Sequence, residues 1–214
     1  MASPHPFRLA RAILFALIFA VNAATALRNF AAEVPNEYEL KSVMILNLAR
    51  FVEWPSNAFA NSDSPMVIGV LGHNPFGDNL EKAVKGEIVN GHPFVVEYYD
   101  SLRSIKTCHI LYICLSEKSN VASILSKIKG QPTLSVSELE GFSNLPGGMV
   151  RFYTNDQKKI RLRLNLDSAR SEGLRVSSKL IQVAEIDHAS LSLPPRAQIS
   201  GSGLSDGFLL SLAR

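Results

Sequence analysis

Two arginines are the side chains best suited to hold an anion in this sequence, and Arg50 is the first of them. It lies in the segment NLARFVEWP, between apolar neighbours and close to the single tryptophan, Trp54. Because a guanidinium keeps its proton, a buried Arg50 would need an anionic partner or carbonyl oxygens. The sequence leaves two partners open: the carboxylate of Glu53, in an ordinary i,i+3 surface pair, and the carboxylate of an incoming ligand.

The second arginine, Arg175, lies in GLRVSS between two short predicted helices. Ser177 or Ser178 can cap the helix that follows, and the amino end of a helix attracts anions. A guanidinium beside exposed helix N–H groups could bind a carboxylate, so Arg50, Arg175 and Ser177 are the candidate ligand-binding residues. The alternative is that Arg175 only flanks a capping turn.

Three aromatic residues, Phe51, Trp54 and Phe76, are candidates for apolar contact with a partner protein. The predicted helix that contains Phe51 has apolar residues on more than one face, whereas an ordinary surface helix has a single apolar stripe. This helix is therefore either enclosed in the core or in contact with another chain. Since tryptophan and arginine often anchor interfaces, the sequence favours a contact surface around Arg50 and Trp54.

The sequence lacks the patterns on which catalysis usually depends. In the loop 69–78, Gly72 and Gly77 have the spacing of a nucleotide phosphate loop, but Asp78 and Asn79 stand where lysine and serine or threonine are needed. The sequence HExxH does not occur, and the histidines are isolated from one another. We therefore predict no catalytic residue, no metal site and no cofactor, and a protein that is not an enzyme.

Residues 1–26 have the pattern of a secretory signal peptide. Two arginines precede the apolar run 12–21, and an A-x-A cleavage pattern follows at 24–26. An uncleaved membrane anchor is the alternative, although the run is shorter than the about 20 residues that span a bilayer. The net charge of +3 over 214 residues does not indicate a nucleic-acid surface. We expect an exported, periplasmic protein.

Two cysteines, Cys108 and Cys114, fall in the predicted strand CHILYIC. Six residues of strand separate two Cα atoms by about 20 Å. A disulfide requires Cα atoms within about 7 Å of each other. The sequence therefore predicts two buried thiols that behave as small hydrophobic side chains.

Strand and helix patterns alternate along most of the chain. Strands are expected at 66–71, 93–99, 108–115 and 132–137, and helices at 36–53, 78–85, 120–129, 168–173 and 178–186. This alternation is typical of an α/β domain, here 36–186, with a largely parallel sheet flanked by helices on both faces. Two runs follow at 146–154 and 158–166, and the second alternates apolar and polar residues, which predicts an antiparallel hairpin at the C-terminal edge. Residues 188–214 show no period and are expected to form a disordered tail.

Several short motifs, taken in order, resemble the YfiR family of exported bacterial proteins. They are LNLARFVEWP, VIGVLGHNPFGDNL, CHILYICLSE, QPTLSVSE, GFSNLPGGMVRF and IRLRLNLDSARSEGLRVSSKLIQVAEI. Each motif is weak alone, whereas their joint occurrence in this order over 38–186 is fairly specific. The cysteines depart from the family, because its disulfide cysteines are not evidently reproduced here.

The resemblance implies a regulatory protein with an α/β core that forms dimers. The best-known family member is a periplasmic repressor that holds the periplasmic part of an inner-membrane diguanylate cyclase inactive and is itself sequestered by an outer-membrane lipoprotein. Lower repression raises cyclic di-GMP and favours biofilm. For this chain, the resemblance implies that it represses or modulates an inner-membrane signalling protein by contact in the periplasm. The alternative is a periplasmic sensor of a small carboxylate or amino acid that serves another signalling system.

Overall fold

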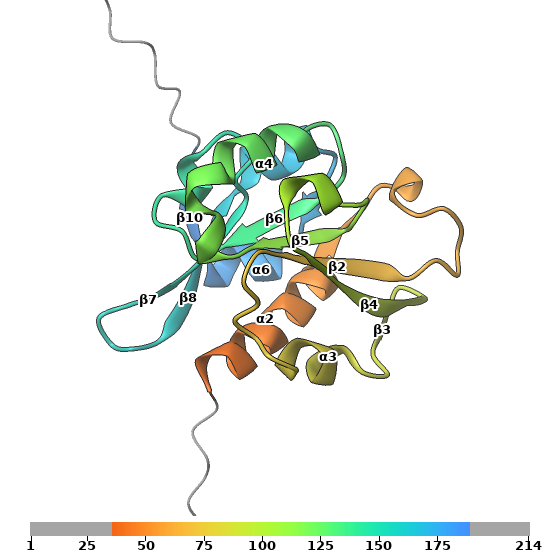
Figure 1. The fold of residues 1–214 in the computed structure, drawn as a ribbon, viewed down its shortest axis with the longest axis horizontal. Coiled ribbons are helices and arrows are strands. Elements are labelled where there is room, and N and C mark those ends of the chain that lie inside the picture. The colour runs from red at the N-terminus through yellow and green to blue at the C-terminus, as the bar shows by residue number, and fades with distance from the viewer. Residues whose placement is uncertain (1–35, 189–214) are drawn as a thin grey trace, which may run out of the picture.

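The computed structural model describes residues 36–188. The predicted signal peptide and the predicted disordered tail, apart from its first residue, lie outside the described residues. The described chain forms an eight-stranded sheet with helices and a separate two-stranded sheet (Figure 1). The predicted α/β fold with a largely parallel main sheet is confirmed.

The main sheet has the strand order β10-β8-β7-β6-β5-β2-β4-β3. Its strands are β2 (Met66–Leu71), β3 (Ile88–Val89), β4 (His92–Tyr99), β5 (Ile110–Ile113), β6 (Leu134–Ser137), β7 (Val150–Thr154), β8 (Ile160–Asn165) and β10 (Glu185–Asp187). Strands β4, β2, β5, β6 and β7 are mutually parallel. Since β4 and β5 both follow β2 in the chain and lie on either side of it, the strand order reverses at β2, and the switch point lies between β2 and β5.

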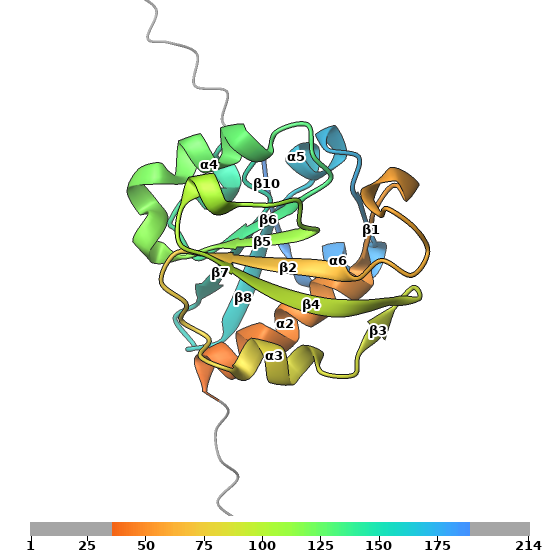
Figure 2. The same ribbon diagram turned by 45° about the vertical axis from the view of Figure 1, so that its right-hand side comes forward.

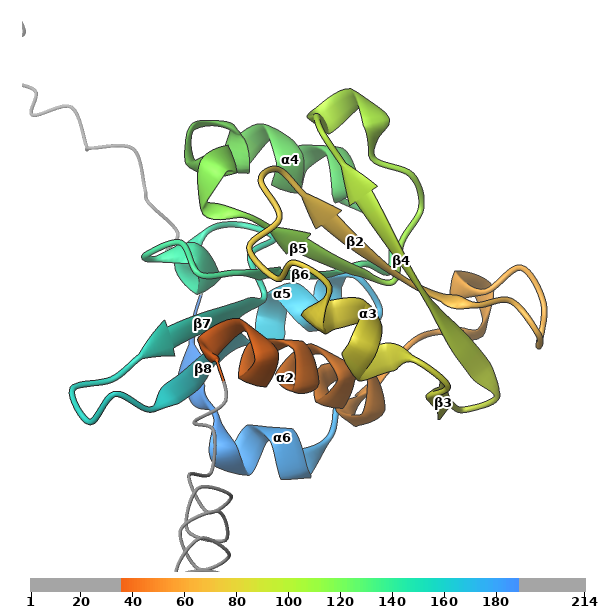
Figure 3. The same cartoon turned by 60° about the horizontal axis from the view of Figure 1, so that its bottom comes forward.

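The helices are α2 (Glu37–Phe51), α3 (Asn79–Val84), α4 (Val121–Ile128), α5 (Leu166–Ser171) and α6 (Ser178–Val183). Short 3-10 turns occur at η1 (Ser56–Ala58), η2 (Leu102–Ser104), η3 (Leu115–Asn120) and η4 (Phe142–Asn144). Figure 3 shows α2 between α3 and α6.

Helix α2 begins where the sequence predicts and ends slightly earlier. The side chain of Asn36 accepts a hydrogen bond from the backbone N–H of Tyr38 at 3.3 Å, which caps the first turn. The helix stops at Phe51 because Val52 and Glu53 are extended and pair with another segment as the short strand β1. Asp78 occupies the predicted N-cap of α3, but its carboxylate pairs with Lys82 at 2.8 Å and makes no capping hydrogen bond.

Side chains of β5 alternate between two hydrophobic clusters. Ile110 and Tyr112 belong to a cluster that also contains Ile45 of α2, with α3 and α6 contributing further residues. Leu111 and Ile113 belong to a second cluster, which contains the apolar residues of α4. Because successive residues of a strand point to opposite faces, α2 and α4 pack against opposite faces of β5. Each fully buried leucine or isoleucine in these clusters contributes roughly 1.5–3 kcal/mol.

The predicted hairpin forms from β7 and β8, and one more strand lies outside it. The helix expected at 178–186 ends at Val183, because residues 185–187 pair with β8 as the parallel strand β10. Arg163 of β8 lies 2.9 Å from Glu185 and 3.4 Å from Asp187. Arg163, at a polar position of the predicted hairpin, therefore binds carboxylates of the next strand.

Both cysteines are buried and free, as predicted. Cys108 lies in the second hydrophobic cluster and Cys114 in the first. Within residues 36–188, no helix combines the length and the apolar composition needed to cross a membrane.

Candidate functional site

The carboxyl ends of β2 and β5 flank the switch point, where ligands of open α/β sheets usually bind. The loops after these two strands lie against each other, and the backbone N–H of His73 donates to Oγ of Ser116 at 2.9 Å. Gly72 makes this approach possible, because a Cβ there would lie 2.4 Å from the same oxygen, and its φ of +95° favours glycine. The two loops are therefore joined by a hydrogen bond at the switch point.

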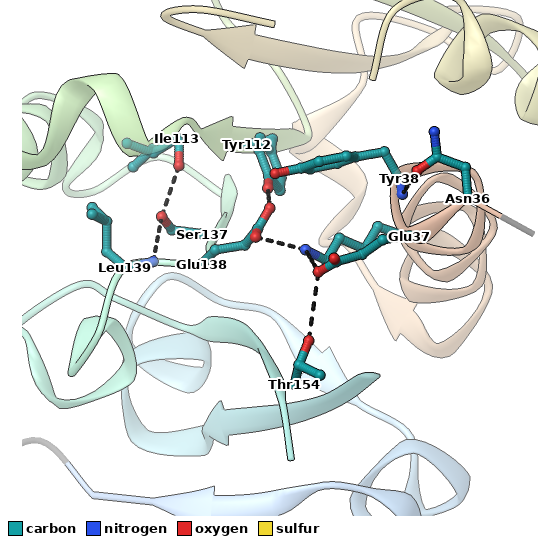
Figure 4. Close-up of polar contacts among 10 residues, drawn as sticks. Asn36, Glu37, Tyr38, Tyr112, Ile113, Ser137, Glu138, Leu139 and Thr154 are labelled. Carbon is teal, nitrogen blue, oxygen red and sulfur yellow. Dashed lines mark hydrogen bonds and ion pairs between the residues drawn. The ribbon is translucent and has the colours of Figure 1, made fainter. Parts of the chain in front are cut away.

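A partly buried ion network lies at the carboxyl ends of β5 and β6 (Figure 4). Lys41 of α2 is only 1% exposed, and its Nζ lies 2.6 Å from a carboxylate oxygen of Glu138 and 2.6 Å from one of Glu37. The hydroxyl of Tyr112 donates to the other oxygen of Glu138. The Lys41 ammonium also lies 4.6 Å from the ring centroid of Tyr38.

Electrostatics keep Lys41 charged at neutral pH. Burial alone would lower the pKa of Lys41, but the hydrogen bonds and charges of Glu138 and Glu37 outweigh it and raise the pKa above the ordinary 10.5. Burial, followed by the hydrogen bond to Glu138, raises the pKa of Tyr112 as well. The network thus fastens the start of α2 to the ends of two central strands. Sequence reasoning missed it, although a lysine inside the apolar run 40–52 was a usable signal.

Most of the sequence-predicted residues gather at the opposite, amino end of the parallel strands. There β1 (Val52–Glu53), which Figure 2 labels, pairs antiparallel with β9 (Arg175–Val176). The backbone N–H of Ser177 donates to the carbonyl of Phe51 at 2.8 Å. The end of α2 is therefore joined to the start of α6, and the segments that carry the predicted residues lie together. These residues are Arg50, Phe51, Trp54, Arg175 and Ser177.

Both candidate arginines are surface residues with carboxylate partners. Arg50 pairs with Glu87 at 2.5 Å, which corrects the expectation of Glu53. Glu53 instead lies opposite Arg175 in the two-stranded sheet and pairs with it at 3.2 Å. The side chains of Arg50 and Arg175 are 44% and 82% exposed. Such pairs are worth about 0–1 kcal/mol, so a partner's carboxylate could replace the internal one at little cost.

Ser177 caps α6, as the sequence predicts. Its hydroxyl accepts a hydrogen bond from the backbone N–H of Leu180 at 3.4 Å. Beside the cap lies a cavity of about 190 Å³, whose lining includes the guanidinium-bearing residues Arg170 and Arg175. Leu166, Val176 and Ile181 complete the lining, which does not include Ser177.

Trp54 is half-buried at the amino end of the sheet. Its indole N–H donates to the carbonyl of His109 at 3.2 Å. It lines a cavity of about 560 Å³ together with Phe59, Met66 and His92. An apolar ring is thus partly presented to solvent while its polar atom is satisfied inside, an arrangement suited to contact with another molecule.

Phe76 is not part of this surface. It is 1% exposed, and its ring centroid lies 4.7 Å from that of Tyr112 and 5.6 Å from that of Tyr38. The side-chain oxygen of Asn74 accepts a hydrogen bond from the N–H of Phe76 in the turn that carries this ring into the core. The structure corrects the prediction that Phe76 contacts a partner, because a buried ring at the carboxyl end cannot reach a partner of the folded protein.

The second apolar face of α2 is only partly covered. Leu40 and Val43 are 44% and 43% exposed, whereas Ile45, Leu46 and Leu48 are buried. The helix is therefore packed on more than one side, as its composition predicts, and still presents apolar side chains to solvent. Among residues 36–188, no group of three potential metal-ligating side chains comes together.

A family model described as YfiR/HmsC-like matches residues 38–185 of this sequence. The chain belongs to the YfiR/HmsC-like family. The matched range includes most of the Lys41 network and all the amino-end residues described above, so both ends of the sheet fall within the family domain. No curated protein matches this YfiR/HmsC-like chain.

Proposed function

We propose that this YfiR/HmsC-like protein is an exported regulatory protein that acts by binding and not by catalysis. It represses or modulates an inner-membrane signalling protein, such as a diguanylate cyclase, through contact with that protein's periplasmic part. The family match over residues 38–185 is the observation that carries this proposal.

The contact surface that we propose consists of Arg50, Phe51, Trp54 and Arg175, which we call the amino-end surface. Its two guanidiniums are exposed and weakly held, and they can form bidentate bonds with carboxylates of a partner. Phe51 and Trp54 supply apolar area beside them. The partner should therefore present acidic residues around an apolar centre.

The binding experiment measures the mature protein against the periplasmic domain of a candidate membrane partner by calorimetry. Arg50→Glu and Trp54→Ala should each weaken binding by about tenfold or more, since anchors of this kind are worth at least 1–2 kcal/mol. Lys118→Glu is the matched control, because it reverses an exposed charge at the other end of the sheet. Full-strength binding by both amino-end variants would remove this surface from the proposal.

Export and assembly are further parts of the proposal. We propose a periplasmic protein whose signal peptide is cleaved near Ala26, which amino-terminal sequencing of the mature protein tests directly. We also propose a homodimer that is in turn bound by an outer-membrane lipoprotein. Light scattering of the purified protein should give twice the monomer mass, and a monomer at micromolar concentration would contradict the dimer.

A second candidate function is a periplasmic sensor of a small carboxylate or amino acid. The cavity of about 190 Å³ beside Arg170 and Arg175 favours it, since two guanidiniums attract a carboxylate and the volume equals that of several water molecules. Organic acids should then raise the unfolding temperature of the wild type but not of Arg175→Ala. If no acid has this effect, the sensor function fails while the binding function stands.

A further inference from the structure

A groove of about 580 Å³ lies between α4 and α5, and the loop before β7 completes its lining. We call it the α4–α5 groove. Its apolar lining includes Val121 and Leu125 of α4 and Leu145 and Pro146 of the loop. Leu125 is buried, Val121 and Leu145 are half-buried and Pro146 is exposed, so apolar atoms of the groove face solvent. A concave apolar surface of this size is suited to bind apolar side chains.

The described chain ends at the rim of this groove. Strand β10 runs parallel to β8, and its last residue, Asp187, lies opposite Asn165, the residue that precedes α5. Nδ1 of the next residue, His188, lies 3.3 Å from the carboxylate of Asp167, which is part of the groove lining. The segment that follows His188 therefore begins beside the α4–α5 groove.

The first residues of that segment have a sequence that fits the groove. Leu191 and Leu193 are separated by one residue, and Pro194 disfavours the helical conformation at Leu193. In an extended chain, residues two apart point to the same side, so both leucines can enter one groove. Since an extended chain advances at most about 3.3–3.6 Å per residue, Leu191 lies within about 10–11 Å of His188. The two leucines are therefore within reach of the apolar lining.

The charges of the groove and of the segment are complementary. Asp167 and Glu172 contribute two carboxylates to the lining, whereas Lys129 contributes one ammonium. Arg196 is the single charged residue of 189–199. Two leucines followed by a cation therefore match an apolar groove with an excess of acidic groups. A segment joined to the domain by a short tether also has an effective concentration on the order of millimolar, which favours it over a free ligand.

We propose that the α4–α5 groove binds Leu191 and Leu193 of the segment that follows His188 in the same chain. This contact covers apolar surface that is otherwise open to solvent, and it fastens the segment to α4 and α5. The groove shares no residue with the amino-end surface, so the contact is independent of partner binding.

Methyl NMR of the full mature protein tests the contact directly. We expect nuclear Overhauser effects between the methyl groups of Leu191 and Leu193 and those of Val121 and Leu125. A mixed sample, in which the two groups of methyls are labelled on separate molecules, should show none of these effects. Effects seen only in the mixed sample would mean that a second copy supplies the segment, and this result would overturn the proposal.

Substitutions in the segment test the role of the two leucines. The double variant Leu191→Ser and Leu193→Ser should lose these methyl contacts and lower the melting temperature by about 3 °C or more, because two apolar side chains are no longer buried. It should also raise the fluorescence of the dye ANS, which binds exposed apolar surface, at least twofold. Leu209→Ser with Leu210→Ser is the matched control, because it changes two leucines of the same segment that lie farther from His188.

Substitutions in the groove test the other side of the contact. Ala122 is exposed and lines the groove, so Ala122→Arg fills it with a charged side chain and should abolish the same methyl contacts. Ser123 is the next residue of α4, is exposed and lies outside the lining, so Ser123→Arg should leave the contacts unchanged. Because both positions are exposed, both variants should fold.

Two results would overturn the proposal in addition to exchange between copies. One is the absence of methyl contacts between the segment and the groove in the wild type. The other is a double variant of Leu191 and Leu193 whose melting temperature and dye fluorescence equal those of the control. None of these readouts involves a partner, so failure of this proposal and failure of the proposed binding function are distinguishable.

Discussion

Replacing Lys41 by methionine should destabilise the domain, because it removes the ammonium that neutralises a buried carboxylate. Methionine has nearly the length of lysine, so the variant leaves little cavity, and its cost is mainly electrostatic. Glu138 would keep the hydroxyl of Tyr112 as a donor but lose its cation. The same change frees Glu37, which is half exposed and can be hydrated instead.

The expected loss of stability in Lys41→Met follows from the burial of the ion pair. Removal of one partner of a buried ion pair costs about 3–5 kcal/mol. Since the Glu138 side chain is 14% exposed and retains one donor, the lower end applies, and we expect about 3 kcal/mol. For a domain of this size, each kcal/mol lowers the melting temperature by about 2–4 °C, so the expected fall is about 6–12 °C.

The assay is urea denaturation at neutral pH, followed by circular dichroism. Glu138→Gln in the Lys41→Met background should recover about 1–2 kcal/mol, because the neutral amide still accepts the Tyr112 hydroxyl and carries no unpaired charge. Lys118→Met, an exposed control, should change stability by less than about 0.5 kcal/mol. A Lys41→Met variant as stable as this control, or a second substitution that recovers nothing, would refute the reasoning.

Three further predictions concern the fold. The free energy of unfolding should fall above pH 10.5, because folding raises the pKa of Lys41 and the stability that charged Lys41 contributes is lost as the pH passes this raised pKa. Denaturation measured over a series of pH values should show a smaller fall for Lys41→Met. Gly72→Ala should cost more than about 1 kcal/mol in the same assay, because its Cβ would meet Oγ of Ser116 and its φ is positive; wild-type stability would contradict this. A reducing agent should leave the melting temperature unchanged, because Cys108 and Cys114 are free, and a fall would indicate a disulfide.

Local sequence patterns were sufficient for most of the fold. The strand at 66–71 and the helix at 120–129 are long periodic segments with clear ends, and the structure places both within a residue or two of the prediction. Strand β10 could not be found in this way, because it has three residues, two of them acidic, and follows a helical pattern. Only its pairing with β8 makes it a strand.

Interactions of the candidate site were predictable where residues close in sequence form them. They were not predictable where residues far apart in sequence form them. Ser177 caps the next helix, an interaction that spacing alone reveals. Arg50 binds Glu87, far along the chain, so local spacing pointed to Glu53 instead. Lys41 shares a helical stripe with the buried Ile45, which could have marked it as buried, but its partner Glu138 depends on how the sheet is assembled.

The central claim, that this YfiR/HmsC-like protein works by contact through its amino-end surface, is tested most directly by hydrogen exchange with and without the membrane-embedded partner. The account predicts that the partner slows exchange at residues 50–54 and 175–177. Slowed exchange confined to the loops 72–78 and 115–120 at the carboxyl end, with none at the amino-end surface, would contradict it.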